Sequence, residues 1–206
     1  MEPDTRSVRE KIRAAAVQLF AEMGYHAAPL RDIASLAGIQ AASIYYYYPS
    51  KQALLVEIMD TYMRQLNANM DRVLAQPSSI PARLYEAIAS HIRLHTTYKA
   101  EFFIIDTEMR ALEGANREQI LVLRDQYEHS LQGLLQEGME QGILRSSDVK
   151  ITSYAVIAMC TTVSSWFHSQ GRLTVQQVID IYSQIITEGL LVKAETPQTR
   201  EESIRP

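Results

Sequence analysis

Apolar residues recur three and four positions apart along most of this chain, and no stretch keeps the two-residue alternation of a half-buried strand. The fold class expected from this pattern is all-α. The stretches between the periodic segments hold most of the prolines and glycines. The expected helices cover residues 8–23, 29–37, 40–47, 51–75, 81–99, 101–113, 116–141, 149–170 and 175–193.

Several helix ends carry local sequence signals. Residues 7–10 and 174–177 match the capping box, in which two side chains satisfy the first free N–H groups of a helix. Pro29 suits the first position of its helix, where the missing N–H costs nothing. Asn116 and Asp148 are expected to cap the helices that begin near them.

A short helix between two longer ones stands out. Gly38 can adopt a positive φ angle, which suits a tight turn between two helices. The small or amide side chains of residues 40–43 allow a backbone to approach another surface closely. Pro49 then ends the short helix, and Ser50 is expected to cap the next one. This order is typical of a helix-turn-helix, whose second helix enters the major groove of DNA.

Residues 8–55 resemble the TetR family of transcriptional regulators. The matching residues are Phe20, Gly24, Tyr25, Asp32, Ile33, Ala34, Ala37, Gly38, Ile39, Ser43, Ile44, Tyr45, Tyr46, Ser50, Lys51, Leu54 and Leu55. Two places depart from the family pattern: Ala28 and Pro29 replace a common threonine pair, and Gln40 replaces a common Ser or Thr. The resemblance implies a helix-turn-helix DNA-binding domain over 1–50 and a ligand-binding and dimerisation domain over 51–206. The helix over 51–75 would link the two.

The four tyrosines at 45–48 cannot all face one way, because each helical position turns about 100° from the last. Ile44 and Tyr48 are expected to pack inward. From the resemblance, phenol hydroxyls would contact phosphates and rings would contact thymine methyl groups. The expected DNA-binding residues are Arg6, Arg31, Gln40, Ala41, Ala42, Ser43, Tyr45, Tyr46, Tyr47 and Lys51. For Lys51 the alternative is an ordinary solvated lysine.

The last two expected helices are apolar on more than one side. A homodimer through helices 149–170 and 175–193, packed as a four-helix bundle, would bury both surfaces. Such a two-fold dimer suits a palindromic operator in double-stranded DNA.

No constellation in the chain favours an enzyme. His91 and His95 share a helix face at a spacing compatible with metal binding, but no glutamate follows His91 as in a zinc protease. A core or pocket pair is the favoured interpretation, and neither a metal nor a cofactor is expected. Cys160 lies in an apolar run and is expected to be an inert core thiol.

The C-terminal part also resembles the branch of TetR-like regulators that senses acyl-CoA thioesters. The likeness lies in KAEFFIIDTEMRALEG, in the long helix after Asn116 and in SSWFHSQGRLTVQQV. An acyl-CoA effector needs an apolar tunnel and nearby cations. The expected ligand-binding residues are His91, His95, Phe102, Phe103, Met109, Arg110, Arg124, Tyr127, Leu131, Met159 and Trp166. Arg93, Lys99 and Arg117 are further cations considered for the phosphates.

Two alternatives remain open for this ligand site. The aromatic residues are also compatible with plain core packing, and the arginines with a solvated face. A multidrug sensor is the rival function, in which Asp106, Glu108 or Glu128 would meet a lipophilic cation between aromatic rings.

Composition and charge add bounds to this picture. The chain has 206 residues, of which 47% are hydrophobic, enough for a substantial core. Residues 1–51 hold six basic and five acidic side chains, whereas the remainder has an acidic excess that brings the total to −4. Only the N-terminal part is therefore free of acidic excess, as local phosphate neutralisation requires. The single cysteine, the polar start and the lack of a long apolar run favour a cytoplasmic protein that spans no membrane.

Overall fold

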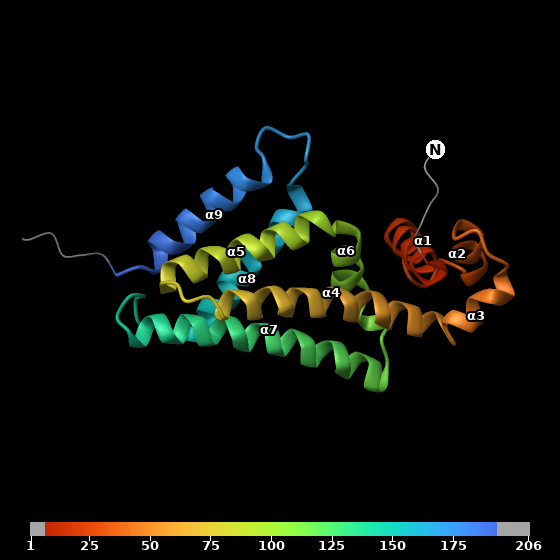
Figure 1. Ribbon diagram of the computed structural model, residues 1–206, viewed down its shortest axis with the longest axis horizontal. Coiled ribbons are helices and arrows are strands. Elements are labelled where there is room, and N and C mark those ends of the chain that lie inside the picture. Colours follow the sequence, from red (N-terminus) through yellow and green to blue (C-terminus); the bar gives the residue numbers. More distant parts are fainter. Residues whose placement is uncertain (1–6, 193–206) are drawn as a thin grey trace, which may run out of the picture.

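The computed structural model describes residues 7–192, which fold into helices (Figure 1). They are α1 (Val8–Met23), α2 (Leu30–Leu36), α3 (Ile44–Tyr47), α4 (Lys51–Leu74), α5 (Ile80–Thr97), α6 (Lys99–Glu108), α7 (Gly114–Glu140), α8 (Val149–Trp166) and α9 (Val175–Leu190). Short 3₁₀ turns lie at Ala41–Ser43 and Met109–Ala111. Across the described range, strand-like pairing is limited to an isolated bridge between Leu144 and Leu191. The all-α prediction is confirmed.

The helices form a small group and a larger body joined by α4. Helices α1–α3 lie at the right of Figure 1, and α4 runs from them into the larger body. There α4 packs along α7, while α5 contacts α4, α8 and α9. The short helix α6 contacts α1, α4 and α5. Both α4 and α6 therefore touch the small group and the larger body.

The small group has its own apolar centre. Ile12, Phe20, Ile33, Ile44 and Tyr48 are among the largest fully buried side chains of the described chain. Each such burial stabilises the fold by about 1.5–3 kcal/mol relative to an exposed side chain. The expected inward packing of Ile44 and Tyr48 is thus confirmed.

Most of the expected helix caps are present. Both capping boxes form, at residues 7–10 and 174–177. The Asp148 carboxylate accepts a hydrogen bond from the Ile151 N–H at 2.9 Å. The Ser50 hydroxyl accepts one from the Ala53 N–H at 3.0 Å. These bonds satisfy N–H groups that have no partner inside the helix.

Two cap assignments were wrong. Pro29 is the N-cap of α2 rather than its first helical residue, with an extended ψ of 145°. Asn116 lies inside α7, two residues after the helix begins. Its amide donates to the Gln52 side chain, so it joins α7 to α4 instead of closing a helix end.

Some helix limits also differ from the prediction. The segment expected as one helix over 40–47 is a 3₁₀ turn followed by the single α turn α3. The helix expected over 101–113 ends at Glu108, and its 3₁₀ extension stops because Leu112 is extended. Likewise α8 ends at Trp166 because Phe167 is extended. Residues 167–170 and 191–192 are therefore not helical, contrary to the prediction, and residue 193 lies outside the described range.

Two glycines fix the path of the chain. Gly38 has φ +73°, a left-handed conformation that turns the chain after α2, as the sequence predicted. Gly138 lets α7 approach the rest of the body closely, since a Cβ there would lie 2.7 Å from Leu144 and 2.8 Å from Ile80.

The sequence predicts a polar arm over 1–6 and a frayed tail from Ala194, and both segments lie outside the described residues. Within residues 7–192, no helix is both long and apolar enough to cross a bilayer.

Candidate nucleic-acid interface and ligand cavity

The segment from Gln40 to Tyr47 presents an uncharged, tyrosine-rich surface. Tyr46 is 86% exposed and Tyr45 is 59% exposed, and the residues of the preceding 3₁₀ turn are exposed as well. Tyr47 is half-buried and packs edge-on against Tyr46, with ring centroids 5.1 Å apart. Tyr45 and Tyr46 are therefore free to contact another molecule, whereas Tyr47 partly supports them.

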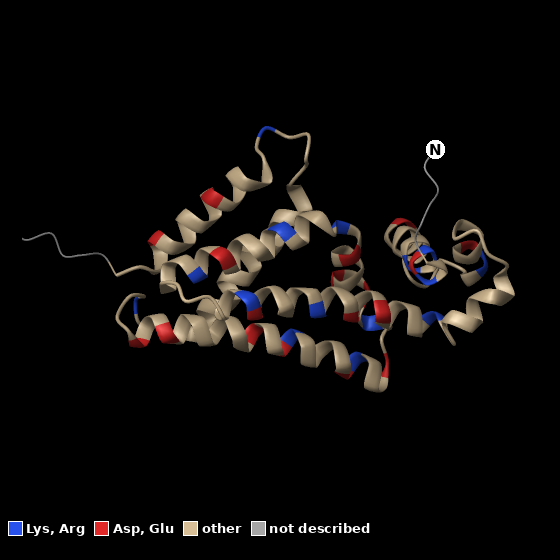
Figure 2. Cartoon of the chain, in the orientation of Figure 1, with Lys and Arg blue, Asp and Glu red and all other residues tan. Residues whose placement is uncertain are grey.

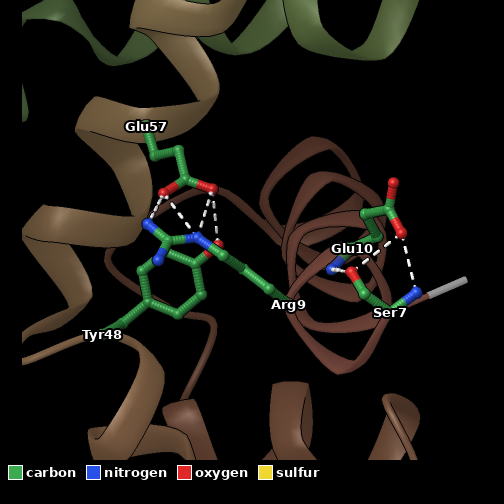
Figure 3. A network of polar contacts seen from close by, with 5 residues as sticks. All are labelled: Ser7, Arg9, Glu10, Tyr48 and Glu57. Atoms are coloured by element: carbon green, nitrogen blue, oxygen red, sulfur yellow. Dashed lines mark hydrogen bonds and ion pairs between the residues drawn. The ribbon is translucent and has the colours of Figure 1, made fainter.

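An ion-pair network holds the end of this segment against two helices (Figure 3). The Tyr48 hydroxyl donates to Glu57 Oε1 at 2.7 Å, and Arg9 Nε lies 3.1 Å from Glu57 Oε2. The Arg9 guanidinium also lies over the Tyr48 ring, 4.9 Å from its centroid. Burial acts to raise the pKa of Glu57, but hydrogen bonds from Arg9 and Tyr48 outweigh it and lower the pKa. The network ties α1 and the end of α3 to α4.

The cations expected at DNA differ in their surroundings. Lys51 Nζ donates to the His26 carbonyl at 3.2 Å and lies 4.6 Å from the Tyr25 ring centroid. Burial lowers the pKa of Lys51. Arg31 is exposed and pairs with the neighbouring Asp32 at 3.2 Å. Arg6 lies outside the described residues. Lys51 is thus engaged within the fold, and Arg31 is available at the surface.

Charged residues flank the tyrosine surface. Figure 2 shows no Lys, Arg, Asp or Glu on α3, while basic and acidic residues lie on α1 and α2 and a basic residue lies at the start of α4. A nucleic acid seated on α3 would meet hydroxyls and aromatic rings in the centre and cations at the sides. That division suits base-edge and methyl contacts inside a groove and phosphate contacts along its walls.

A second site is a cavity of about 110 Å³ inside the larger body. It lies between α4, α5, α6, α7 and α8. Among the residues expected at a ligand, the cavity brings together His91, His95, Phe102, Arg124 and Tyr127. Asp106 and Glu128, considered for the multidrug alternative, also line it. The rest of its wall is apolar apart from Thr161 and the Tyr62 hydroxyl.

Other expected ligand residues lie elsewhere. Leu131 lines a smaller adjoining space that His91 and Tyr127 also border. Phe103 is exposed on α6 and does not border the cavity, and Trp166 is exposed and stacks on Tyr182. The remaining residues outside the cavity are Met109, Arg110 and Met159.

The additional cations considered for phosphates also lie away from the cavity. Arg93 donates to the Gln176 side chain at 2.8 Å, and Lys99 donates to the Phe167 carbonyl at 2.7 Å. Arg117 is exposed near the start of α7. Arg124 is therefore the basic residue that borders the cavity in the described chain.

Sequence reasoning missed part of the cavity wall. The missed residues are Tyr62, Met63, Leu66, Ile105, Ile157 and Thr161. Half of them lie on α4, whose apolar stripe was interpreted only as a connection between the two parts of the molecule. The sequence did contain a signal for Tyr62. A tyrosine within an apolar stripe carries a hydroxyl that needs a polar partner when it is buried, which indicates a polar neighbour or a ligand.

The two histidines form the buried end of the cavity. Their rings stack, with centroids 4.0 Å apart. His91 Nδ1 lies 2.7 Å from the Tyr127 hydroxyl and its Nε2 lies 3.0 Å from Thr161 Oγ1. His95 Nδ1 donates to the His91 carbonyl at 3.0 Å. Burial lowers the pKa of His91 well below its ordinary value and that of His95 to about 4, so both are neutral at pH 7.

Acid is expected to destabilise the protein through these histidines. Because the folded pKa of His95 is about 4 against an ordinary 6.5, the unfolded chain binds more protons between these values. The free energy of unfolding should therefore fall as the pH drops through this window, by about 2 kcal/mol at pH 5. Urea unfolding of wild type at pH 7 and pH 5 measures this.

The control is a matched pair of variants, His95→Gln and His168→Gln, the latter at an exposed histidine. His95→Gln should reduce the loss between pH 7 and pH 5. An unchanged loss in that variant would show that another group carries the acid sensitivity.

Family models match both parts of the chain. Residues 12–58 match the model described as bacterial regulatory proteins, tetR family, and residues 77–190 match a tetracyclin repressor-like C-terminal domain. The second match alone spans more than half of the 206 residues.

Individual relatives support the same family. The chain is 26% identical over 184 residues to the HTH-type transcriptional repressor KstR2 of Rhodococcus jostii, covering 88% of this chain and 90% of the relative. It is 23% identical over 178 residues to the fatty acid metabolism regulator protein of Bacillus subtilis, covering 85% and 92%.

A solved structure extends the likeness to a complex. The crystal structure of AibR with isovaleryl coenzyme A and operator DNA superposes with a TM-score of 0.79 at 25% identity, covering 87% of this chain and 97% of that one. The family matches, the helix-turn-helix and the full-length likeness lead to one conclusion. The chain belongs to the TetR family of bacterial transcriptional regulators.

Proposed function

We propose that this regulator is a repressor that leaves its operator when a short acyl-CoA thioester enters the cavity. The observation that carries the proposal is the cavity itself, an apolar space bordered by the two helices that contact the helix-turn-helix. DNA would be read by the segment 40–47 with Arg31 and the start of α4. The DNA-binding domain would end near residue 50, and the protein would act in the cytoplasm without a catalytic role.

The size of the cavity favours a short acyl group. A dry apolar cavity of about 150 Å³ accommodates a benzene molecule, and this one is about 110 Å³. An acyl group of four to six heavy atoms is a comparable volume. Arg124 is exposed at the rim, where it would meet the polar remainder of coenzyme A. AibR, which is similar over most of the chain, was solved with isovaleryl coenzyme A.

A lipophilic cation is the second candidate effector. Asp106 and Glu128 border the same cavity as the Phe102 ring, so a cation at the rim would meet two carboxylates and an aromatic face. If the effector is instead an acyl-CoA, the same two carboxylates would keep its phosphates outside the cavity, because like charges repel at short distance.

A homodimer through α8 and α9 is part of this proposal. Both helices present large apolar side chains to the outside, with Ile151 at 64% and Ile185 at 54% exposure, together with Tyr154 and Ile181. The exposed apolar positions recur at helical spacing along each helix, at 151, 154 and 158 on α8 and at 181 and 185 on α9. A second copy of the chain would cover them by two-fold symmetry.

Helix α6 provides a physical route from effector to DNA. It contributes Phe102, Ile105 and Asp106 to the cavity. One turn later, Glu108 Oε1 accepts a hydrogen bond from the Tyr25 backbone N–H at 3.1 Å, just after α1. A ligand that shifts α6 therefore acts on the backbone of the helix-turn-helix. The ligand shifts the equilibrium between the DNA-binding arrangement and the released arrangement only if its affinities for the two differ.

Glu108→Ala is expected to weaken this coupling. It removes the acceptor that joins α6 to the end of α1, so the effector-dependent change in operator affinity should shrink by about 1 kcal/mol. Operator binding with and without effector, measured by fluorescence anisotropy, gives the coupling. Glu118→Ala, at an exposed position of α7, is the control. Equal coupling in both variants would exclude α6 as the route.

The test of the function uses the promoter DNA beside the protein's own gene. Isovaleryl-CoA is expected to lower operator affinity roughly tenfold or more, while isovalerate and free coenzyme A should have no effect. Release by tetraphenylphosphonium but not by the thioester would support the lipophilic-cation alternative instead. Specific DNA binding that no thioester changes would contradict the acyl-CoA proposal and leave the regulator intact.

A further inference from the structure

The inner end of the cavity contains an acceptor without a partner. His95 Nδ1 is the donor to the His91 carbonyl, which leaves Nε2 of the neutral ring with a lone pair. Within residues 7–192 no protein hydrogen bond reaches that Nε2, and the atom is not among the fully buried atoms that lack a partner. His91 differs, because both of its ring nitrogens are bonded.

A donor without a partner lies against the same ring. The Tyr62 hydroxyl is buried and has no hydrogen-bond partner in the described chain, and Tyr62 lines the cavity. Its ring meets His95 edge-on, with centroids 5.6 Å apart. Burial raises the pKa of this phenol, and the nearby Tyr127 and Glu101 raise it further. The Tyr62 hydroxyl therefore stays protonated and can donate a hydrogen bond. Arg83 Nε and Ser183 Oγ also lack partners, but neither residue borders this cavity.

These two groups impose a chemical requirement on the ligand. The buried Tyr62 hydroxyl costs free energy while it lacks a bond, and an alkyl group offers a hydrogen bond neither to it nor to His95 Nε2. A carboxylate would be buried beside neutral histidines with no cation at that end, which is costlier still. A hydroxyl group has the chemistry that both need, since it can accept from Tyr62 and donate to His95 Nε2.

We infer that the cavity selects an acyl group that carries an uncharged hydroxyl on its buried portion, in preference to a plain alkyl chain. The inference rests on the proposed function for the thioester part of the ligand. The polar end formed by Tyr62 and His95 does not depend on it. Met63, Leu66 and Ile157 enclose the carbon skeleton.

The first measurement compares two thioesters that differ only by hydroxyl against methyl. 3-Hydroxybutanoyl-CoA (both enantiomers) and 3-methylbutanoyl-CoA are titrated into the full-length protein by calorimetry. The hydroxy thioester is expected to bind about tenfold more tightly. Tyr62→Phe should remove this preference by weakening the hydroxy ligand alone. The variant should also raise the Tm of the free protein, because it deletes an unpartnered buried hydroxyl.

Tyr98→Phe, at an exposed tyrosine between α5 and α6 that does not border the cavity, is the matched control and should change neither quantity. A second pair of probes, cyclopentanol and methylcyclopentane, carries no coenzyme A and is measured by ligand-observed NMR. If no thioester binds but cyclopentanol is preferred and Tyr62→Phe abolishes that preference, the acyl-CoA proposal fails and the polar end stands. Equal affinity within both pairs, a preference for the methyl ligands, or no binding by any probe overturns the inference.

Discussion

Replacing Tyr46 with alanine is expected to weaken operator binding by about 1–3 kcal/mol, roughly ten- to a hundredfold, and to leave the fold intact. Tyr46 is the most exposed of the four tyrosines, and no described partner holds it beyond the edge of Tyr47. Surface truncations of this kind change stability by about 0.5 kcal/mol or less. Fluorescence anisotropy and thermal unfolding measure the two effects separately.

Two further variants, Tyr46→Phe and Arg31→Ala, test how Tyr46 contacts the operator. Tyr46→Phe keeps the ring and removes the hydroxyl, so it separates a phosphate or base hydrogen bond from ring contact with a methyl group. Because Tyr46 is uncharged, Tyr46→Ala should leave the salt dependence of binding unchanged, whereas Arg31→Ala should lower its slope by about 1. Undiminished operator affinity in Tyr46→Ala would exclude α3 as the reading element.

Lys51→Ala is expected to behave differently from Tyr46→Ala. Its ammonium donates to the His26 carbonyl and lies over the Tyr25 ring, so the substitution removes contacts inside the fold. Operator affinity and stability should therefore fall together, the latter by about 1 kcal/mol. The sequence alone suggested a phosphate contact with no structural cost.

The second large effect is expected for Ile185→Glu, which should convert the dimer to a monomer. Ile185 is 54% exposed in one chain and lies in the apolar face of α9. A carboxylate there would be buried at the interface without a partner, which disfavours association. Affinity for a full palindrome should fall by about a hundredfold or more, because the second half-site no longer binds at high effective concentration.

Sedimentation velocity gives the oligomeric state and circular dichroism the retained helicity. Val122→Glu makes the same chemical change at a similarly exposed apolar residue of α7 and should remain dimeric. A stable Ile185→Glu dimer with full operator affinity would show that another surface carries the dimer.

Local sequence signals determined much of the architecture. Apolar periodicity located every long helix, because burial of one face needs only the residues of that helix. Both capping boxes and the Asp148 cap formed as expected, since their bonds span three residues. The turn at Gly38 also followed from one residue's conformational freedom.

Contacts between distant residues were decided only by the tertiary structure. Periodicity identifies the buried face of α4 but not which neighbours it meets, so Tyr62 was not expected at the cavity. Phe103 and Trp166 were expected there but face outward, because the packing of α6 and α8 sets the rotation of each helix. Glu108 meets Tyr25 across 83 residues. Such contacts depend on helices packing against one another, which no local pattern of the chain specifies.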